Sequence, residues 1–195
     1  MTNTAAALIL CLIVLPAAAA QTPGQPYSSY WFPDELLSWT PGGDPDAPYN
    51  RGSIQLATRS LGDTQANIHA RPDEAGIAAL SIMYPSTSGN PSQGSRELDT
   101  YAFNYWQYTD VLVMWGGSAG EGLILSPSAD VIDAGHRNGV PVYGTVFFPP
   151  LAYGGQLQWV EDFVQSSGGT YPVADKLIQV AEYYGFDGWF INQET

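Results

Sequence analysis

Basic residues and cysteine are scarce in this 195-residue chain. Lysine occurs once, at Lys176, and Lys and Arg together number six against 19 acidic residues, so the net charge is −13. Nucleic acid and anionic membrane surfaces both require clustered Lys and Arg, so neither is expected as a partner. The single cysteine, Cys11, allows no disulfide and no Cys-based metal site. His69 and His136 lack ligand spacing, so no metal and no cofactor is expected.

The first 20 residues predict a secretory signal peptide. Residues 5–20 are apolar, Pro16 interrupts them late, and small residues at 18–20 would permit cleavage before Gln21. A transmembrane anchor is the alternative, because residues 1–4 carry no positive charge, but the apolar run is short for a bilayer span. The expectation is a secreted, extracellular protein with no membrane partner after cleavage.

The remaining chain divides into an N-terminal arm and a regular region. Residues 21–50 are rich in Pro, Gly, Tyr and Asp and predict an extended arm, which residues 31–33 and 36–37 could dock against a core. Beyond residue 51, strands are predicted at 77–84, 111–115, 140–148 and 188–192, and helices at 101–108, 127–138, 157–164 and 172–184. Alternating strands and helices predict an α/β fold of parallel β/α units. Four such units are half of a TIM (β/α)8 barrel.

Two polar residues at the end of the last strand are the best candidates for catalysis. Asn192 and Glu194 are two positions apart, so on a strand they would project from one face, roughly 7 Å apart along the backbone. The carboxyl ends of barrel strands are where such enzymes hold their chemistry. Burial after three large apolar residues would raise the pKa of the Glu194 carboxyl and suit it to act as an acid. The alternatives are an exposed loop Glu194 and a strand-end turn at Asn192.

Four further residues could bind a carbohydrate. Trp115, Phe147 and Tyr153 lie at or just beyond predicted strand ends, where aromatic rings could stack on sugar rings. Core packing is the alternative for Trp115 and Phe147, whereas Tyr153 lies in a Gly-rich loop. Glu121 could bind a hydroxyl group, although a solvated loop position is its more common role.

Three longer motifs resemble glycoside hydrolase family 85, the endo-β-N-acetylglucosaminidases. They are residues 115–122 (WGGSAGEG), 136–145 (HRNGVPVYGT) and 186–194 (FDGWFINQE), supported by 103–108 and 173–177. The resemblance is collinear over about residues 50–195. It implies a TIM-barrel catalytic domain, with residues 51–195 forming its N-terminal half and the first four β/α units. It also implies cleavage of the β-1,4 bond in the N,N'-diacetylchitobiose core of N-linked glycans.

The resemblance also implies roles for individual residues. Asn192 would orient the substrate's 2-acetamido group, whose oxygen attacks the anomeric carbon to form an oxazoline intermediate. Glu194 would act as the acid and then as the base, so that configuration is retained. Trp115, Phe147, Tyr153 and Glu121 would contact the sugar. Many family members are cytoplasmic, which is the alternative to secretion.

Two other functions stay open at this point. A glycan-binding protein could use the same cleft without cleavage, although it would need no catalytic acid. A family 18-like chitinase is the other, but Phe190 and Asn192 replace two aspartates of that family's strand motif. Because the chain stops at Thr195, we also expect that these residues alone are inactive and poorly soluble.

Overall fold

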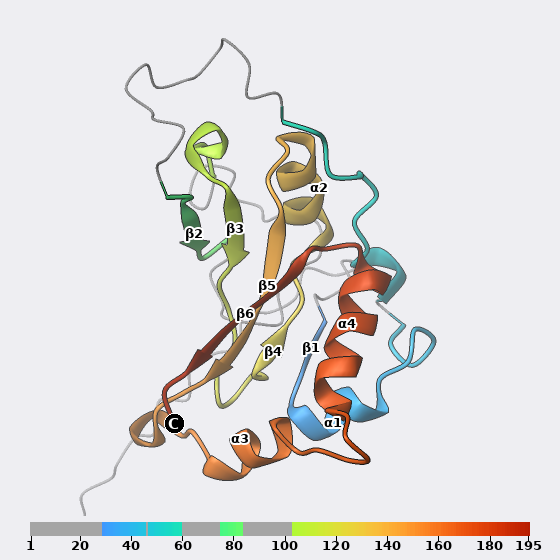
Figure 1. The fold of residues 1–195 in the computed structure, drawn as a ribbon, viewed down its shortest axis with the longest axis vertical. Coiled ribbons are helices and arrows are strands. Elements are labelled where there is room, and N and C mark those ends of the chain that lie inside the picture. Colours follow the sequence, from blue (N-terminus) through green and yellow to red (C-terminus); the bar gives the residue numbers. More distant parts are fainter. Residues whose placement is uncertain (1–28, 46, 60–74, 84–102) are drawn as a thin grey trace, which may run out of the picture.

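The structure is a computed structural model that describes residues 29–45, 47–59, 75–83 and 103–195. Single turns of 3-10 helix occur at Ala47–Tyr49, Trp106–Tyr108 and Leu151–Tyr153. The predicted signal peptide, residues 1–20, lies outside the described residues and stays a prediction. The strands and helices (Figure 1) are β1 Tyr30–Trp31, α1 Pro33–Ser38, β2 Ala78–Ser81, β3 Val111–Met114, β4 Ile124–Leu125, α2 Ala129–Arg137, β5 Val142–Phe148, α3 Leu157–Phe163, α4 Pro172–Tyr184 and β6 Gly188–Gln193.

Four parallel strands form the part of the sheet that the sequence predicted. β2 pairs with β3, β3 with β5, and β5 with β6, all in parallel. β6 stays in register with β5 from Tyr143↔Gly188 to Phe148↔Gln193. Helix α2 precedes β5, and α3 and α4 connect β5 to β6. The α/β class is therefore confirmed, whereas closure into an eight-stranded barrel stays a proposal.

The sheet is mixed, which the sequence did not predict. β1 pairs antiparallel with β4, and β4 pairs antiparallel with the second half of β5. On this edge β5 pairs first with β3, at Val142 and Tyr143, and then with β4, at Thr145 and Val146. Strands of two residues carry no readable periodicity, so β1 and β4 left no signal in the sequence.

Helix α4 has the predicted bounds but a different buried face. Pro172 opens it, and Gly185 ends it in the left-handed conformation, with φ of 80°. Apolar residues at positions 174, 177, 178 and 181 of the sequence share one face of a helix and predict that this face is buried, but Ile178 is 57% exposed. The helix instead buries Val173, Leu177, Val180 and Tyr184.

Two other helices are shorter than predicted. α2 begins at Ala129, after Ser128, so Pro127 lies outside it and Ser126 is not its cap. Ser126 is buried, and its hydroxyl donates instead to the carbonyl oxygen of Ser29 at 3.1 Å. In the described part of residues 101–108, the helix is the single turn Trp106–Tyr108.

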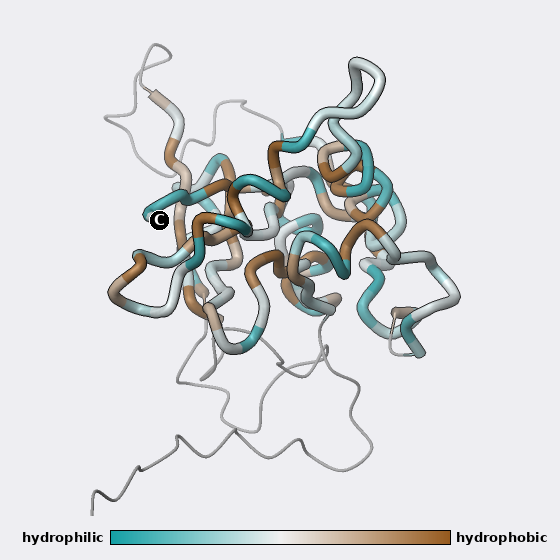
Figure 2. Tube along the Cα trace, turned by 90° about the horizontal axis from the view of Figure 1, so that it is seen from below, coloured by the Kyte–Doolittle hydropathy of each residue, from teal (hydrophilic) through white to brown (hydrophobic). Residues whose placement is uncertain are grey.

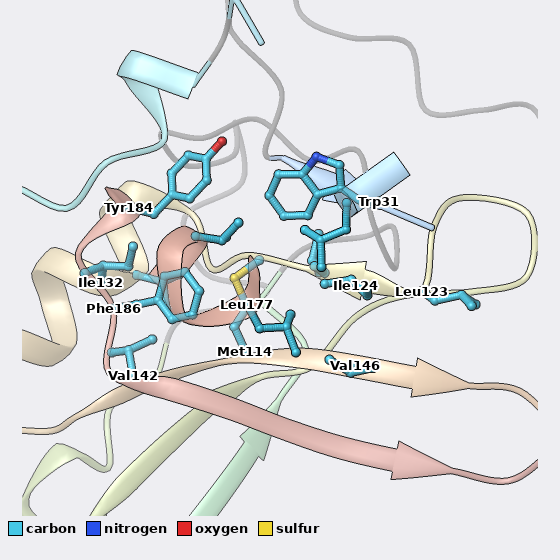
Figure 3. Close-up of a cluster of buried hydrophobic side chains, with 14 of the residues drawn as sticks. Trp31, Met114, Leu123, Ile124, Ile132, Val142, Val146, Leu177, Tyr184 and Phe186 are labelled. Carbon is cyan, nitrogen blue, oxygen red and sulfur yellow. The ribbon is translucent and has the colours of Figure 1, made fainter. Parts of the chain in front are cut away.

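The hydrophobic core covers one face of the sheet. Figure 3 shows side chains of β3 and β5, such as Met114 and Val146, packed with Leu177 and Tyr184 of α4. Val142, Val146 and Phe148 alternate along β5 and are all buried. Tyr143 and Phe147 project from the opposite face, because neighbouring residues of a strand point to opposite sides, and both are only partly buried. Thr145, which lies between them on this face, is fully buried, so the accessible part of this face is at its partly exposed residues, including Phe147 near the carboxyl end of β5.

The N-terminal segment is docked against the core and is not fully extended. Residues 33–38 form helix α1, contrary to the extended arm that the sequence predicted. The Tyr184 hydroxyl donates to Ser29 Oγ at 2.9 Å, and Asn50 Nδ2 donates to the same oxygen at 2.9 Å. Burial raises the pKa of Tyr184 to about 12. Among the described residues, no helix is long and apolar enough to cross a bilayer.

A buried histidine joins three segments at the amino ends of β5 and β6. His136 Nδ1 lies 2.5 Å from the carbonyl oxygen of Ile54, and Nε2 lies 2.9 Å from Asp187 Oδ2. Asp187 Oδ2 also accepts the backbone N–H of Val142 at 2.8 Å. An acceptor therefore faces each ring nitrogen, and Asp187 links the start of β6 to the start of β5. Both residues therefore connect elements of the fold.

Replacing His136 with alanine is expected to lower the free energy of unfolding by about 2–3 kcal/mol, because a buried side chain and its contacts to two partly exposed partners are lost. Urea unfolding monitored by circular dichroism measures the change as a lower midpoint at an unchanged slope. Gln179→Ala, at an exposed position of α4, is the control and should stay within about 0.5 kcal/mol of the parent. Equal stability of both variants would show that the His136 contacts contribute nothing.

Candidate active site

The carboxyl ends of β5 and β6 lie side by side at the lower end of the sheet, beside the last residue of the chain (Figure 1). Asn192 Nδ2 donates a hydrogen bond to Glu194 Oε1 at 2.8 Å. The structure thus brings the two side chains together, as their spacing on a strand predicted. In Figure 2, seen from below, the chain ends in a hydrophilic segment. An amide and a carboxylate are therefore paired at the open end of the sheet.

Backbone contacts hold this pair in place beyond the end of β6. The N–H of Glu194 donates to the carbonyl oxygen of Phe148 at 2.9 Å, a bond that belongs to the last pair of β5 and β6, Phe148↔Gln193. The Thr195 hydroxyl donates to the carbonyl oxygen of Pro149 at 2.8 Å. The backbone of Glu194 and the side chain of the next residue are therefore bonded to the end of β5 and the loop after it, whereas the Glu194 carboxylate, bonded to Asn192, is exposed.

The burial predicted for Glu194 is wrong for this chain. Glu194 is exposed and Asn192 is partly buried, and Ile191 on the other face of β6 is 53% exposed. Among the described residues, β6 pairs along one edge only, with β5. The sequence predicted a strand buried on both faces, because a run of Trp, Phe and Ile is typical of one. In the described part of the chain, only the edge of β6 that pairs with β5 is covered by another strand.

Three aromatic rings lie next to the pair on the open face. The ring centroid of Trp115 lies 5.2 Å from that of Phe147 and 6.1 Å from that of Phe190. Phe147 is the register partner of Asn192, and parallel partners project from the same face. We call Trp115, Phe147 and Phe190 the aromatic group. All three rings are partly exposed, so they form a surface on which a sugar ring could stack.

Phe190 was not predicted as a site residue. The signal was present, since positions 190, 192 and 194 alternate along one strand and so share a face. The apolar character of Phe190 favoured a core position instead. Its contact with Trp115, a residue 75 positions earlier in the chain, could not be read from the sequence.

Tyr153 and Glu121 lie in two loops that touch at the same end of the sheet. A side-chain carbon at Gly154 would lie 3.2 Å from Ala119 Cβ, so the loop after β5 packs against the loop after β3. Tyr153 is 80% exposed and stands apart from the aromatic group. Glu121 is partly buried, and its backbone N–H donates to Ser118 Oγ at 3.1 Å. The structure places both near the strand ends but outside the aromatic group.

Clusters of His, Cys, Asp and Glu that could bind a metal ion are absent from the part of the chain that the structure describes.

Comparison with known proteins identifies the family. Residues 84–195, more than half of the chain, match the sequence profile of glycosyl hydrolase family 85. The chain belongs to family 85. The resemblance inferred from the three motifs is thus confirmed, and the matched residues include every element that forms the candidate site.

Relatives of this family 85 chain include the proteins named cytosolic endo-beta-N-acetylglucosaminidase from Gallus gallus and Mus musculus. They are 32% and 37% identical over 163 residues, which is 83% of this chain and 20% of each relative. A similar solved structure is the glycoside hydrolase domain of Endo-D from Streptococcus pneumoniae R6. It is 44% identical with a TM-score of 0.71, and the match covers 88% of this chain and 26% of that one. The chain therefore spans about a fifth of the curated relatives it matches.

Proposed function

We propose that this chain supplies the acid and the orienting amide of an endo-β-N-acetylglucosaminidase acting on N-linked glycans. The hydrogen bond between Asn192 and Glu194 at the carboxyl end of β6 is the observation that carries the proposal. Family membership supports it, because the relatives in chicken and mouse are named for this activity. The substrate would be the β-1,4 bond between the two N-acetylglucosamines of the glycan core.

In the proposed reaction, the substrate provides its own nucleophile. The Asn192 amide hydrogen-bonds the 2-acetamido group and aligns its carbonyl oxygen with the anomeric carbon. That oxygen forms a bond to the anomeric carbon as the glycosidic bond breaks, and Glu194 gives its proton to the leaving oxygen. The acetamido nitrogen keeps its proton, so the intermediate is an oxazolinium ion; Glu194, now a carboxylate, takes a proton from the water that attacks its anomeric carbon and reopens the ring to the acetamide. Two displacements at one carbon retain its configuration.

The aromatic group would bind the sugar on which this chemistry occurs. Trp115 and Phe147 lie beside Asn192, where a ring could stack on the face of an N-acetylglucosamine. Tyr153 and Glu121, in the two touching loops, would contact more distant parts of the glycan. Stacking would hold the sugar ring in place, so the Asn192 amide would have to align only the acetamido group of the substrate.

A closed (β/α)8 barrel is the fold we propose for the complete catalytic domain. The unpaired edge of β6 in the described chain and the exposed Ile178 of α4 are positions that a following strand and helix would cover. The curated relatives are named cytosolic, which favours the cytoplasmic alternative and does not support secretion.

A hybrid domain tests the proposed function. Residues 29–195 of this chain would replace the matching segment of the Endo-D glycoside hydrolase domain, to which they are similar in fold. We expect the purified hybrid to release a glycan ending in one N-acetylglucosamine from a high-mannose glycoprotein, as measured by mass spectrometry. A folded hybrid that cleaves chitin instead would favour the family 18-like activity. Glycan binding without release would favour a binding protein.

The 195-residue chain by itself is expected to release no measurable glycan. Glu194 is exposed in it, and a general acid depends on a partly desolvated site that holds its proton and positions the leaving group. The assay compares the isolated chain with the hybrid at equal concentration on the same glycoprotein. Activity of the isolated chain within about tenfold of the hybrid would show that the described residues form a sufficient site.

A further inference from the structure

A single buried hydroxyl lies where β5 changes its pairing partner. β3 and β5 are paired at Val113↔Tyr143, and two residues later β4 is paired with β5 at Leu125↔Thr145. The end of β3 therefore separates from β5 at Thr145. The Thr145 side chain is fully buried, and its hydroxyl donates to the carbonyl oxygen of Met114 at 2.6 Å. This bond links the two strands beyond the point at which their backbone pairing ends.

The same peptide unit is also held from its other side. The N–H of Trp115 donates to the carbonyl oxygen of Ser81, the last residue of β2, at 2.9 Å. The C=O of Met114 and the N–H of Trp115 belong to one planar peptide, so two bonds in opposite directions determine the orientation of that plane. The plane in turn fixes the position of the Trp115 Cα, the atom from which the side chain projects.

We infer that Thr145 is a positioning residue for the substrate site, acting through Trp115. Its hydroxyl holds the peptide between Met114 and Trp115 so that the Trp115 ring packs 5.2 Å from Phe147, beside Asn192. Thr145 itself is buried and does not touch the substrate. The use of the ring for sugar binding rests on the proposed function, whereas the placement of the ring does not.

The first test measures the placement of the ring without any activity. The hybrid domain is labelled with 5-fluorotryptophan, and its Trp115 signal is identified by its loss in Trp115→Phe. Thr145→Val should shift or broaden this fluorine signal, and Thr145→Ser, which keeps the hydroxyl, should restore it. Thr109→Val is the matched control, because Thr109 is buried and its hydroxyl also donates to a backbone carbonyl, that of Tyr105. It should leave the Trp115 signal unchanged.

The second test measures the consequence for substrate in the hybrid domain. Thr145→Val should raise KM about three- to tenfold, the factor that corresponds to the net free energy of one hydrogen bond. kcat should stay unchanged, because Asn192 and Glu194 lie on and beyond β6. In a Trp115→Ala background, Thr145→Val should have no further effect on KM.

Each outcome has a defined meaning. An unchanged Trp115 signal in folded Thr145→Val overturns the inference, and so does equal disturbance by Thr109→Val. If the valine variant does not fold, Thr145→Ala replaces it, because it removes the same hydroxyl. The alanine variant should then show the same shift of the Trp115 signal and the same rise in KM. A shifted signal with unchanged KM overturns the role in substrate binding, and it does so independently of whether Asn192 and Glu194 are catalytic.

Discussion

A hybrid domain with Glu194→Gln is expected to hydrolyse a high-mannose glycoprotein about 100- to 10,000-fold more slowly than the hybrid with Glu194, which is the contribution of general acid–base catalysis. Glutamine keeps an oxygen that can accept the hydrogen bond from Asn192 Nδ2, observed here at 2.8 Å. It can neither protonate the leaving oxygen nor take a proton from water. The loss should therefore be in kcat, with the site otherwise preserved.

The leaving group provides a sharper test of the same role. A substrate whose leaving group is a weakly basic phenol needs little protonation, so the defect of Glu194→Gln in the first step should shrink on it. Glu182→Gln, on the exposed side of α4, is the matched control and should retain the parent rate. A defect of equal size on both substrates, or none on the glycoprotein, would remove Glu194 from the role of acid.

Asn192→Ala is expected to reduce hydrolysis of the same glycoprotein about 100- to 1,000-fold, the loss seen when one well-placed hydrogen-bonding group is removed from a developing charge. Asn192 Nδ2 donates to Glu194, so its amide oxygen is the group that would accept the acetamido N–H, where positive charge develops. Without the amide, the acetamido oxygen is no longer held in line with the anomeric carbon, and the lost orientation adds to the barrier. The readout is the initial rate of glycan release in the hybrid domain.

Asn192→Asp separates this role from that of an ordinary nucleophile. A carboxylate accepts hydrogen bonds from the acetamido N–H but would stand beside Glu194 as a second negative charge, and the hydrogen bond between positions 192 and 194 would be lost. We expect Asn192→Asp to recover part of the rate lost in Asn192→Ala. Rates equal to the parent in Asn192→Ala would exclude the amide from the reaction.

The sequence predicted the parts of the fold that depend on local patterns. Parallel strands and the helices between them follow from alternating apolar runs, and α4 follows from Pro172 and Gly185 at its two ends. The buried face of α4 could not be predicted from the helix alone, because two apolar stripes lie side by side on it. Which stripe is buried depends on how the helix packs against the sheet. β4 is a two-residue strand within a loop, and its pairing with β5 depends on a tertiary contact.

The candidate site was predicted to a similar extent. The pairing of Asn192 with Glu194 follows from a period of two along a strand, and the structure shows it as a hydrogen bond. The contact of Phe190 with Trp115 and the bond from Thr145 to Met114 each join strands that are distant in sequence. No local pattern encodes such contacts. The exposure of Glu194 also differs from its prediction, since burial depends on what else covers the strand.

Supplying the intermediate directly is the most decisive measurement for the substrate-assisted mechanism. The Asn192→Ala hybrid would be assayed on an intact glycoprotein and on a preformed glycan oxazoline. If Asn192 acts in forming the intermediate, the variant loses at least about 100-fold on the glycoprotein and opens the oxazoline within about tenfold of the parent, because Glu194 still activates water. Equal losses on both substrates, or full activity on the intact glycoprotein, would refute the mechanism proposed for this pair.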